Sequence, residues 1–177
     1  MFDNEYQFTG RHARIVKELT SVFGYDNVKI FERNVDVLIM APIVGFIYGC
    51  KGIQESSKSD ENVVKINYQQ LQSNLEDLRF NYQLIMLLDK KNEPSYEERI
   101  NKAFRYLGDK LSKEDWNLFN EYILGGIEKL QEKLLEESVN PEDYVLNLYE
   151  LVNEIQERYN EDSDLDGVEE LFKLAKA

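Results

Sequence analysis

Hydrophobic residues recur every three or four positions along most of the chain, which predicts a mainly α-helical protein. Residues that favour helix N-termini, such as Thr9, Ser95 and Asn140, stand just before several of these runs. The predicted helices cover approximately residues 10–23, 34–52, 68–89, 96–107, 112–134, 141–159 and 168–174. We therefore expect a compact multi-helix domain.

Two short segments follow a different pattern. Residues 28–31 and 62–67 alternate apolar and polar side chains, which is the period of a half-buried β-strand. If both are strands, they pair with each other as a small hairpin or an edge ribbon. The fold class is thus mainly α with room for one small two-stranded β element.

The segment from Asn34 to Gly52 is apolar on nearly every side, as expected of a helix buried all round. Pro42 removes one backbone donor and is expected to kink or divide this helix. Ala41, Gly45 and Gly49 lie four residues apart and form a seam of small residues. Such a seam lets a neighbouring element approach closely, so we interpret this segment as the centre of the fold.

A pair of glycines, Gly125 and Gly126, interrupts the helix that begins near Ser112. Each glycine costs about 1 kcal/mol relative to alanine inside a helix. We interpret the pair as a point of close packing rather than a hinge. The next helix carries an apolar stripe made of Val145, Leu148, Tyr149, Val152 and Ile155.

Charge is distributed unevenly along the 177 residues, whose net charge is −13. Residues 1–52 hold six basic and six acidic residues, whereas residues 53–177 hold 15 basic and 28 acidic ones. We treat residues 1–177 as one helical domain with a neutral N-terminal part and an acidic remainder. An acidic surface repels phosphate backbones, so direct nucleic-acid binding by the acidic part is not expected.

The one basic cluster lies in the neutral part. Arg11, Arg14 and Lys17 share a helix face, with Arg33 a further member, and these residues are candidates for contact with a phosphate backbone or an acidic partner. The alternative interpretation is a solvated helix face. Asp36 is expected to form a structural ion pair with Arg33 or Arg105, with Asn34 as the helix cap.

The sequence also bears on the cellular location of the protein and on its reactive side chains. There is no secretory signal and no apolar run long enough to span a bilayer, and Cys50 has no second cysteine to pair with, so a cytoplasmic location and no membrane association are expected. We interpret Cys50 as a buried structural thiol and His12, the single histidine, as a surface or helix-end residue. No phosphate loop, nucleophile elbow or paired-histidine motif is present, so neither a catalytic site nor a cofactor is predicted.

One segment resembles half of a metal site. Asp162, Asp164 and Asp166 followed by Gly167 match the first part of a calcium-binding EF-hand loop. The second part fails, because Lys173 occupies the position that should supply a bidentate carboxylate. An acidic turn before the last helix is the competing interpretation.

Three stretches resemble small proteins associated with bacterial DNA phosphorothioation islands. They are FERNVDVLIMAPIVGFIYGCKG (residues 31–52), ERINKAFR (residues 98–105) and LFNEYILGGIEKL (residues 118–130). The resemblance implies a bacterial origin and an accessory part in a defence or DNA-modification system. It carries no catalytic residue over to this chain.

These observations lead to three functional hypotheses. The first is a non-enzymatic accessory or adaptor protein of a bacterial or phage-related defence or DNA-modification system, acting through a protein partner that belongs to a DNA-processing complex. The second is an acidic inhibitor that mimics DNA and occupies a nuclease or modification enzyme. The third is a nuclease or hydrolase with an unrecognised carboxylate site.

Overall fold

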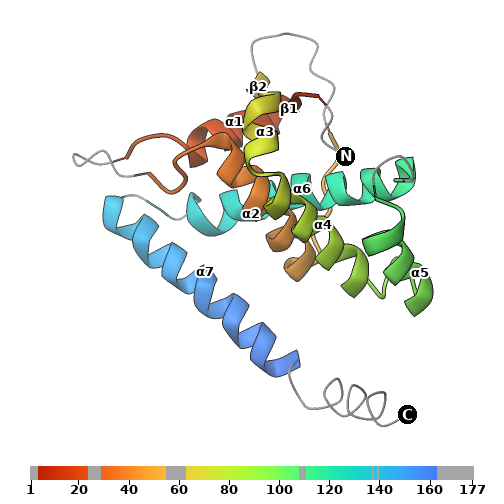
Figure 1. The fold of residues 1–177 in the computed structure, drawn as a ribbon. Helices are drawn as coiled ribbons and strands as arrows, with labels where there is room; N and C mark the ends of the chain where they lie inside the picture. Colours follow the sequence, from red (N-terminus) through yellow and green to blue (C-terminus); the bar gives the residue numbers. More distant parts are fainter. Residues whose placement is uncertain are drawn as a thin grey trace.

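The computed structural model describes residues 4–23, 29–54, 63–107, 111–136, 138 and 140–162, and confirms a mainly helical fold with one small sheet (Figure 1). Its elements, in chain order, are β1 (Tyr6–Thr9), α1 (Gly10–Leu19), α2 (Asn34–Tyr48), β2 (Val63–Ile66), α3 (Tyr68–Ser73), α4 (Leu75–Leu88), α5 (Tyr96–Ile100), the π-helical turn η2 (Asn101–Arg105), α6 (Lys113–Leu134) and α7 (Pro141–Asp162). None of the described helices is both long and apolar enough to cross a membrane.

The small sheet confirms the second predicted strand but corrects its partner. β2 pairs antiparallel with β1, so that Tyr6 lies opposite Ile66 and Phe8 opposite Val64. Residues 29–31 do not form a strand, and residue 28 lies outside the described part. The strand at β1 was missed because it is only four residues long and leads straight into α1, through Gly10 with a φ of 58°. Its role is to bury Phe8 in the core.

The centre of the fold is the contact between α2 and α6, and it uses the predicted seam. A Cβ atom added to Gly45 would collide with the carbonyl oxygen of Tyr122, and one added to Gly126 would collide with the carbonyl oxygen of Ala41. The two helix backbones therefore touch, because neither side has a side chain to hold them apart. The glycine pair of α6 is confirmed as a close-packing point, within a helix that runs unbroken from Lys113 to Leu134.

The third member of the predicted seam behaves differently. Gly49 is not a point of close packing, since a Cβ there would meet no atom within 4 Å. It has a φ of 64° and ends α2 in the left-handed conformation that favours glycine. The helix therefore ends at Tyr48 and not at Gly52, and it passes through Pro42 without dividing. Gly52 makes the close approach instead, since its Cβ would lie 2.7 Å from the backbone nitrogen of Gly125.

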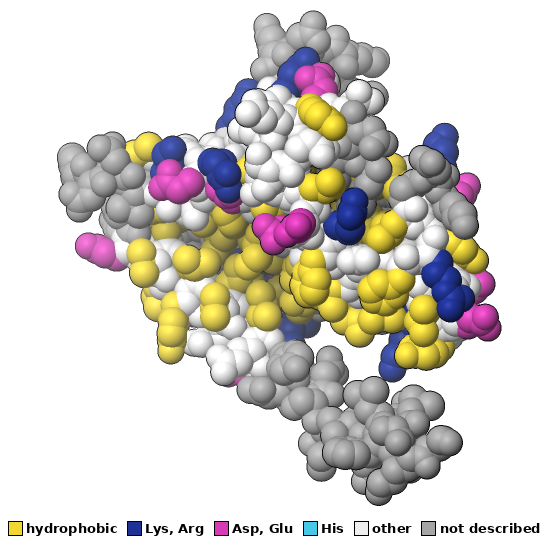
Figure 2. Space-filling view, in the orientation of Figure 1, with side chains coloured by type: hydrophobic (Ala, Val, Ile, Leu, Met, Phe, Trp, Pro, Cys, Tyr) yellow, Lys and Arg dark blue, Asp and Glu magenta, His cyan; other side chains and the backbone are white. Residues whose placement is uncertain are grey.

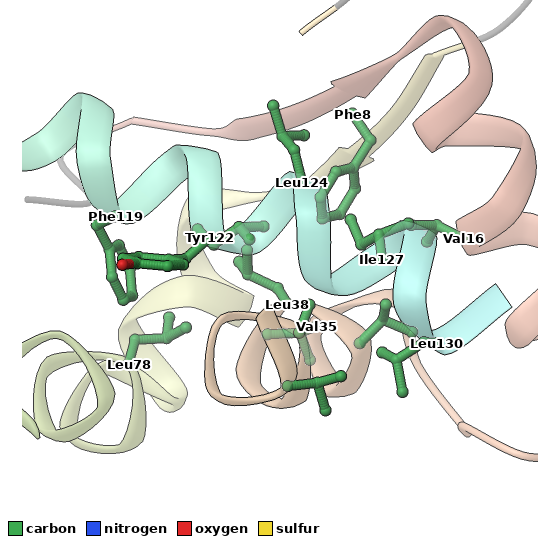
Figure 3. Packing of buried hydrophobic residues seen from close by; sticks show 14 of the residues in the cluster. Phe8, Val16, Val35, Leu38, Leu78, Phe119, Tyr122, Leu124, Ile127 and Leu130 are labelled. Atoms are coloured by element: carbon green, nitrogen blue, oxygen red, sulfur yellow. The ribbon is translucent and has the colours of Figure 1, made fainter. Parts of the chain in front are cut away.

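Apolar side chains from most of the elements meet around this contact. Figure 3 shows Phe8 of β1, Val16 of α1, Leu38 of α2, Leu78 of α4 and the side chains of α6 together in one cluster. Ten residues of α6 are buried, Asp115 among them. The α6 helix is therefore the element on which the others pack.

Several predicted helix boundaries move because polar side chains compete with the helix. α1 ends at Leu19 and not at Phe23, where the hydroxyl groups of Thr20 and Ser21 donate to the carbonyl oxygens of Val16 and Glu18 at 2.9 and 2.7 Å. The predicted helix 68–89 is two helices, α3 and α4, joined at Asn74. The Asn74 side chain donates to the carbonyl oxygen of Gln70 at 2.8 Å.

Candidate protein-binding surface

α7 is a 22-residue helix that lies along one edge of the molecule and contacts the rest chiefly through α6 (blue in Figure 1). It begins as predicted, at Pro141 with Glu142 and Asp143 in the first turn, and the backbone N–H of Asn140 donates to the Asp143 carboxylate at 2.7 Å. Of its hydrophobic residues with described side chains, Leu151 alone is fully buried. A surface helix of this length ordinarily buries a whole apolar stripe.

Polar and aromatic contacts hold the inner side of α7. The Glu154 carboxylate accepts hydrogen bonds from Lys133 at 2.7 Å and from the Tyr48 hydroxyl at 2.5 Å. The Arg158 guanidinium lies over the Tyr48 ring, 4.4 Å from its centroid. The hydrogen bonds from Lys133 and Tyr48 hold the pKa of the Glu154 carboxyl below its ordinary value. Glu154 is therefore the electrostatic anchor of α7.

The first turns of α7 are held by neighbouring side chains as well. The Tyr144 ring packs on Phe23, with 4.2 Å between ring centroids. The Asn147 side chain donates to the Ser138 hydroxyl at 2.9 Å. These contacts fix which face of α7 points away from the body.

That outward side is apolar. Val145, Leu148, Tyr149 and Val152, which we call the outer face of α7, are 63%, 38%, 64% and 49% exposed. They occupy positions i, i+3, i+4 and i+7 and so form one continuous stripe along two turns. Figure 2 shows hydrophobic side chains gathered along this part of the molecule and continuing across its middle. The stripe predicted from the sequence therefore exists, but most of it is in contact with solvent.

Glu142 adjoins the outer face, whereas Glu150 and Glu157 lie on the other side of α7, roughly 140° to 160° around the helix axis from Val152. All three glutamates are exposed and form no ion pair with any described residue. Helix α7 holds seven acidic residues and one basic residue, Arg158. A cavity of about 150 Å³ lies between α6 and α7 and is lined by Glu132, Glu136 and Glu150 together with Lys133 and others.

The predicted basic cluster is partly neutralised within the chain. Arg11 pairs with Glu128 at 2.5 Å, Arg14 reaches Glu18 at 4.0 Å, and Arg33 pairs with Asp36 at 2.5 Å. Lys17 is exposed on α1. Arg11, Arg14 and Lys17 do lie on the outer side of α1, where Arg11 is closely paired and Arg14 makes a longer contact between exposed side chains.

The ion pair expected for Asp36 forms with Arg33 and not with Arg105, which donates to the Asn101 side chain at 2.9 Å. Asp36 also accepts a hydrogen bond from the backbone N–H of Arg33 at 2.9 Å, so it closes the start of α2. Asn34 is the first residue of the helix and not its cap. Asp36 thus has the structural role expected of it.

The interpretation of His12 as a surface residue is wrong. His12 is fully buried between α1 and α6, and its Nε2 atom lies 2.8 Å from the Glu128 carboxylate. It is buried because it falls on the α1 face that also holds Ile15 and Leu19, and the sequence gives no sign of the acid opposite. Cys50 is only partly buried, with its sulfur 3.6 Å from the carbonyl oxygen of Tyr48.

The acids that are buried have structural partners. Asp89 accepts from the Tyr122 hydroxyl at 2.8 Å and from the Asn92 side chain at 2.6 Å. Asp115 pairs with Lys102 at 3.1 Å, and the same ammonium group pairs with Glu93 at 3.1 Å. Burial by itself would lower the pKa of Lys102, but the two carboxylates outweigh it and raise that pKa. The first cluster joins the end of α4 to α6, and the second joins η2 to α6.

The predicted calcium loop lies almost wholly outside the described residues. Asp162 is the last residue of α7, and Asp164 and Asp166 follow the end of the described chain. Within the described ranges, no group of three or more metal-binding side chains comes together. The half-loop stays a prediction.

Comparison with protein families, with curated protein sequences and with solved structures gave no match to this chain. The resemblance to proteins of phosphorothioation islands therefore stays a prediction.

Proposed function

We propose that this protein is a non-enzymatic accessory protein that acts by binding another protein through the outer face of α7. The observation that carries the proposal is the exposure of Val145, Leu148, Tyr149 and Val152 on a helix with a single fully buried apolar side chain among those described. Contiguous exposed apolar surface with a polar border is the usual mark of a protein-interaction site. Bacterial defence and DNA modification are the setting in which the partner is to be sought first.

The other surfaces support the proposal less well. Gly45 and Gly126 are covered by each other's helices, so the seam of α2 offers nothing to a partner. A DNA mimic needs a continuous array of carboxylates that replaces phosphates. On α6 and α7 the carboxylates Glu132 and Glu154 are engaged by Lys129 and Lys133, which breaks such an array.

An enzyme with a carboxylate site is also less well supported. Asp89 and Asp115 are the buried acids of the described part, and each is committed to hydrogen bonds or ion pairs that join helices. A cavity of about 210 Å³ beside Arg33 and Gln70 is lined by amide and hydroxyl side chains and holds no acid. It is smaller than the pockets of about 300–1,000 Å³ that usually hold small-molecule ligands.

Site-specific photocrosslinking in cells that naturally make the protein tests the proposal. A benzophenone amino acid replaces Tyr149 on the outer face in one variant and Tyr96 on α5 in the other. The two tyrosines are matched, at 64% and 61% exposed. We expect one discrete protein adduct from position 149 that is absent from position 96, and expect the Val152→Glu substitution to remove it.

Two results would overturn the proposal. One is an equal adduct pattern from both positions, which would mean that the outer face has no preferred neighbour. The other is an adduct at position 149 that survives Val152→Glu, because a docked partner must desolvate the Val152 side chain.

A further inference from the structure

We infer that this protein forms a homodimer, in which the solvent side of helix α4 packs antiparallel on the same helix of a second copy. The surface is separate from the outer face of α7, so the inference stands or falls independently of the proposed function. Three features of the described structure carry it: an apolar stripe on α4, charges of opposite sign at the two ends of that stripe, and a local charge balance that the whole chain lacks.

The solvent side of α4 is apolar. Phe80 and Leu88 are 61% and 47% exposed, and Leu84 and Leu87, which lie between them, are only partly buried. These four residues, which we call the α4 stripe, stand at positions i, i+4, i+7 and i+8 and so share one side of the helix. Tyr82 and the other buried residues of α4 lie in the core. Figure 2 shows hydrophobic side chains gathered across the middle of the molecule, where α4 runs in Figure 1.

Charges of opposite sign stand at the two ends of the stripe. Glu76 and Asp77, the acidic end, lie in the first turn of α4, and Lys90 and Lys91, the lysine end, follow the last turn. All four side chains are exposed and form no ion pair with any described residue. Acids at the start of a helix and cations at its end complement the dipole of that helix. The same order makes α4 electrostatically complementary to an antiparallel copy of itself.

A two-fold axis near Leu84 brings the stripe onto itself. If Leu84 of one copy lies opposite Leu84 of the other, Phe80 lies opposite Leu88, and the acidic end of each helix lies opposite the lysine end of the other. A two-fold interface makes each of these pairings twice. Apolar side chains then occupy the middle of the contact and charged ones its border, which is the usual composition of a protein interface.

The charge around α4 is balanced, unlike that of the whole chain. Residues 68–92 hold three acidic and three basic residues, whereas the chain has a net charge of −13. Helix α7 by contrast holds seven acidic residues and one basic residue. Two copies that meet through α4 therefore keep their most acidic surfaces apart, where salt screens the repulsion between them. A strongly basic or acidic partner would meet one attractive and one repulsive end, so the charge pattern favours a second copy.

Sedimentation equilibrium of the full-length protein tests the inference. The stripe rises about 12 Å along α4, so the interface is small, and we expect a monomer–dimer equilibrium with a dissociation constant on the order of 10 µM. Phe80→Glu is expected to raise that constant at least about tenfold, because it buries unpaired carboxylates in the apolar contact. The matched control Tyr149→Glu, at a residue 64% exposed against 61% for Phe80, leaves the constant unchanged.

Exchange of the charges at the two ends tests the antiparallel arrangement. Glu76→Lys/Asp77→Lys puts lysines at both ends of α4, and Lys90→Glu/Lys91→Glu puts acids at both. Each variant alone is expected to dimerise about five- to tenfold more weakly at low salt, because like charges then face each other. An equimolar mixture of the two is expected to recover dimers, since each end again joins acids to lysines. The variant with all four substitutions, whose charge changes cancel, is expected to dimerise like the wild-type protein.

Three results would overturn the inference. One is a wild-type protein that stays monomeric up to about 1 mM, a concentration at which even a weak specific contact is populated. Another is a dimer that Phe80→Glu leaves intact, which would place the contact elsewhere on the molecule. The third is a mixture of the two charge variants that dimerises no better than either alone, which would show that the two ends do not meet. Circular dichroism of each variant distinguishes a lost contact from a lost fold.

Discussion

Apolar side chains are buried at the contact between α2 and α6, whereas most of those on α7 are exposed. Where α2 meets α6, Gly45 and Gly126 bring two backbones into contact and the apolar residues around them are buried. On α7, Leu151 is buried while its neighbour Val152 stands half-exposed in solvent. Helices α6 and α7 both have apolar residues at helical spacing. The apolar face of α6 is covered by other described elements, whereas most of the stripe on α7 is not. Periodicity thus predicts that a face will be covered, and it does not say by which molecule.

Breaking the seam should have the largest effect on stability. We expect Gly126→Ala to lower the free energy of unfolding by about 3 kcal/mol or more, because the new methyl group meets the carbonyl oxygen of Ala41, a backbone atom that cannot rotate away. Inside an ordinary exposed helix the same change is stabilising by up to about 1 kcal/mol. Urea unfolding monitored by circular dichroism measures the difference.

A glycine outside the seam provides the control for this prediction. Gly49 has open space around its Cβ position but a φ of 64°, so Gly49→Ala is expected to cost only about 1 kcal/mol, from the left-handed backbone. If Gly49→Ala lowered the free energy of unfolding as much as Gly126→Ala, backbone conformation and not close packing would explain why these positions require glycine.

Substitution of two adjacent residues, Leu151 and Val152, compares the inner and outer sides of α7 directly. We expect Leu151→Ala to cost about 2 kcal/mol, since it leaves a void where a buried side chain packed. Val152→Ala is expected to change stability by no more than about 0.5 kcal/mol, because that side chain is already half in solvent. Thermal unfolding of both variants, with hydrogen exchange of the α7 amides, measures the two effects. Equal losses for the two variants would contradict the assignment of sides.

Acid should loosen α7 before it affects α6. The pKa of Glu154 is lowered in the folded protein by hydrogen bonds from Lys133 and Tyr48. Its contribution is therefore present above the ordinary carboxyl pKa of 4.5 and is lost as the pH falls through the lowered value. The contribution is under about 1 kcal/mol, because the Glu154 side chain is 38% exposed and solvent screens its interactions.

We expect amide exchange in α7, corrected for the intrinsic pH dependence, to accelerate below about pH 4.5 while the amides of Phe119 to Leu130 stay protected. Glu154→Gln should show faster α7 exchange already at pH 7 and little further change on acidification. An unchanged acid response in that variant would mean that another group anchors the helix.

The sequence predicted well those features that depend on local pattern. The central apolar helix, the seam at Ala41 and Gly45, the packing role of Gly125 and Gly126 and the start of α7 at Pro141 are all confirmed. Each follows from residue types whose backbone preference or size acts on its immediate neighbours. Short elements were less predictable. β1 is four residues long, and 53 positions separate Thr9 at its end from Val63, the residue of β2 that pairs with it.

Contacts between side chains that lie far apart in the chain could not be predicted from one sequence. Nothing near His12 indicates that Glu128 lies opposite it, and nothing near Arg11 indicates that the same carboxylate takes up its charge. The basic cluster consequently looked more available than it is. The outer face of α7 was visible as a stripe, but its exposure became known only once the positions of α6 and Leu151 were known.

The free energy of unfolding of the double variant Tyr149→Glu/Val152→Glu shows whether the outer face of α7 is free of packing within the molecule, and its measurement requires no partner. We expect a value within about 0.5 kcal/mol of the wild-type protein, since both side chains already lie in solvent on a helix anchored from its other side. A loss of about 2 kcal/mol or more would show that the stripe is packed within the molecule, and the outer face of α7 would then not be a binding surface.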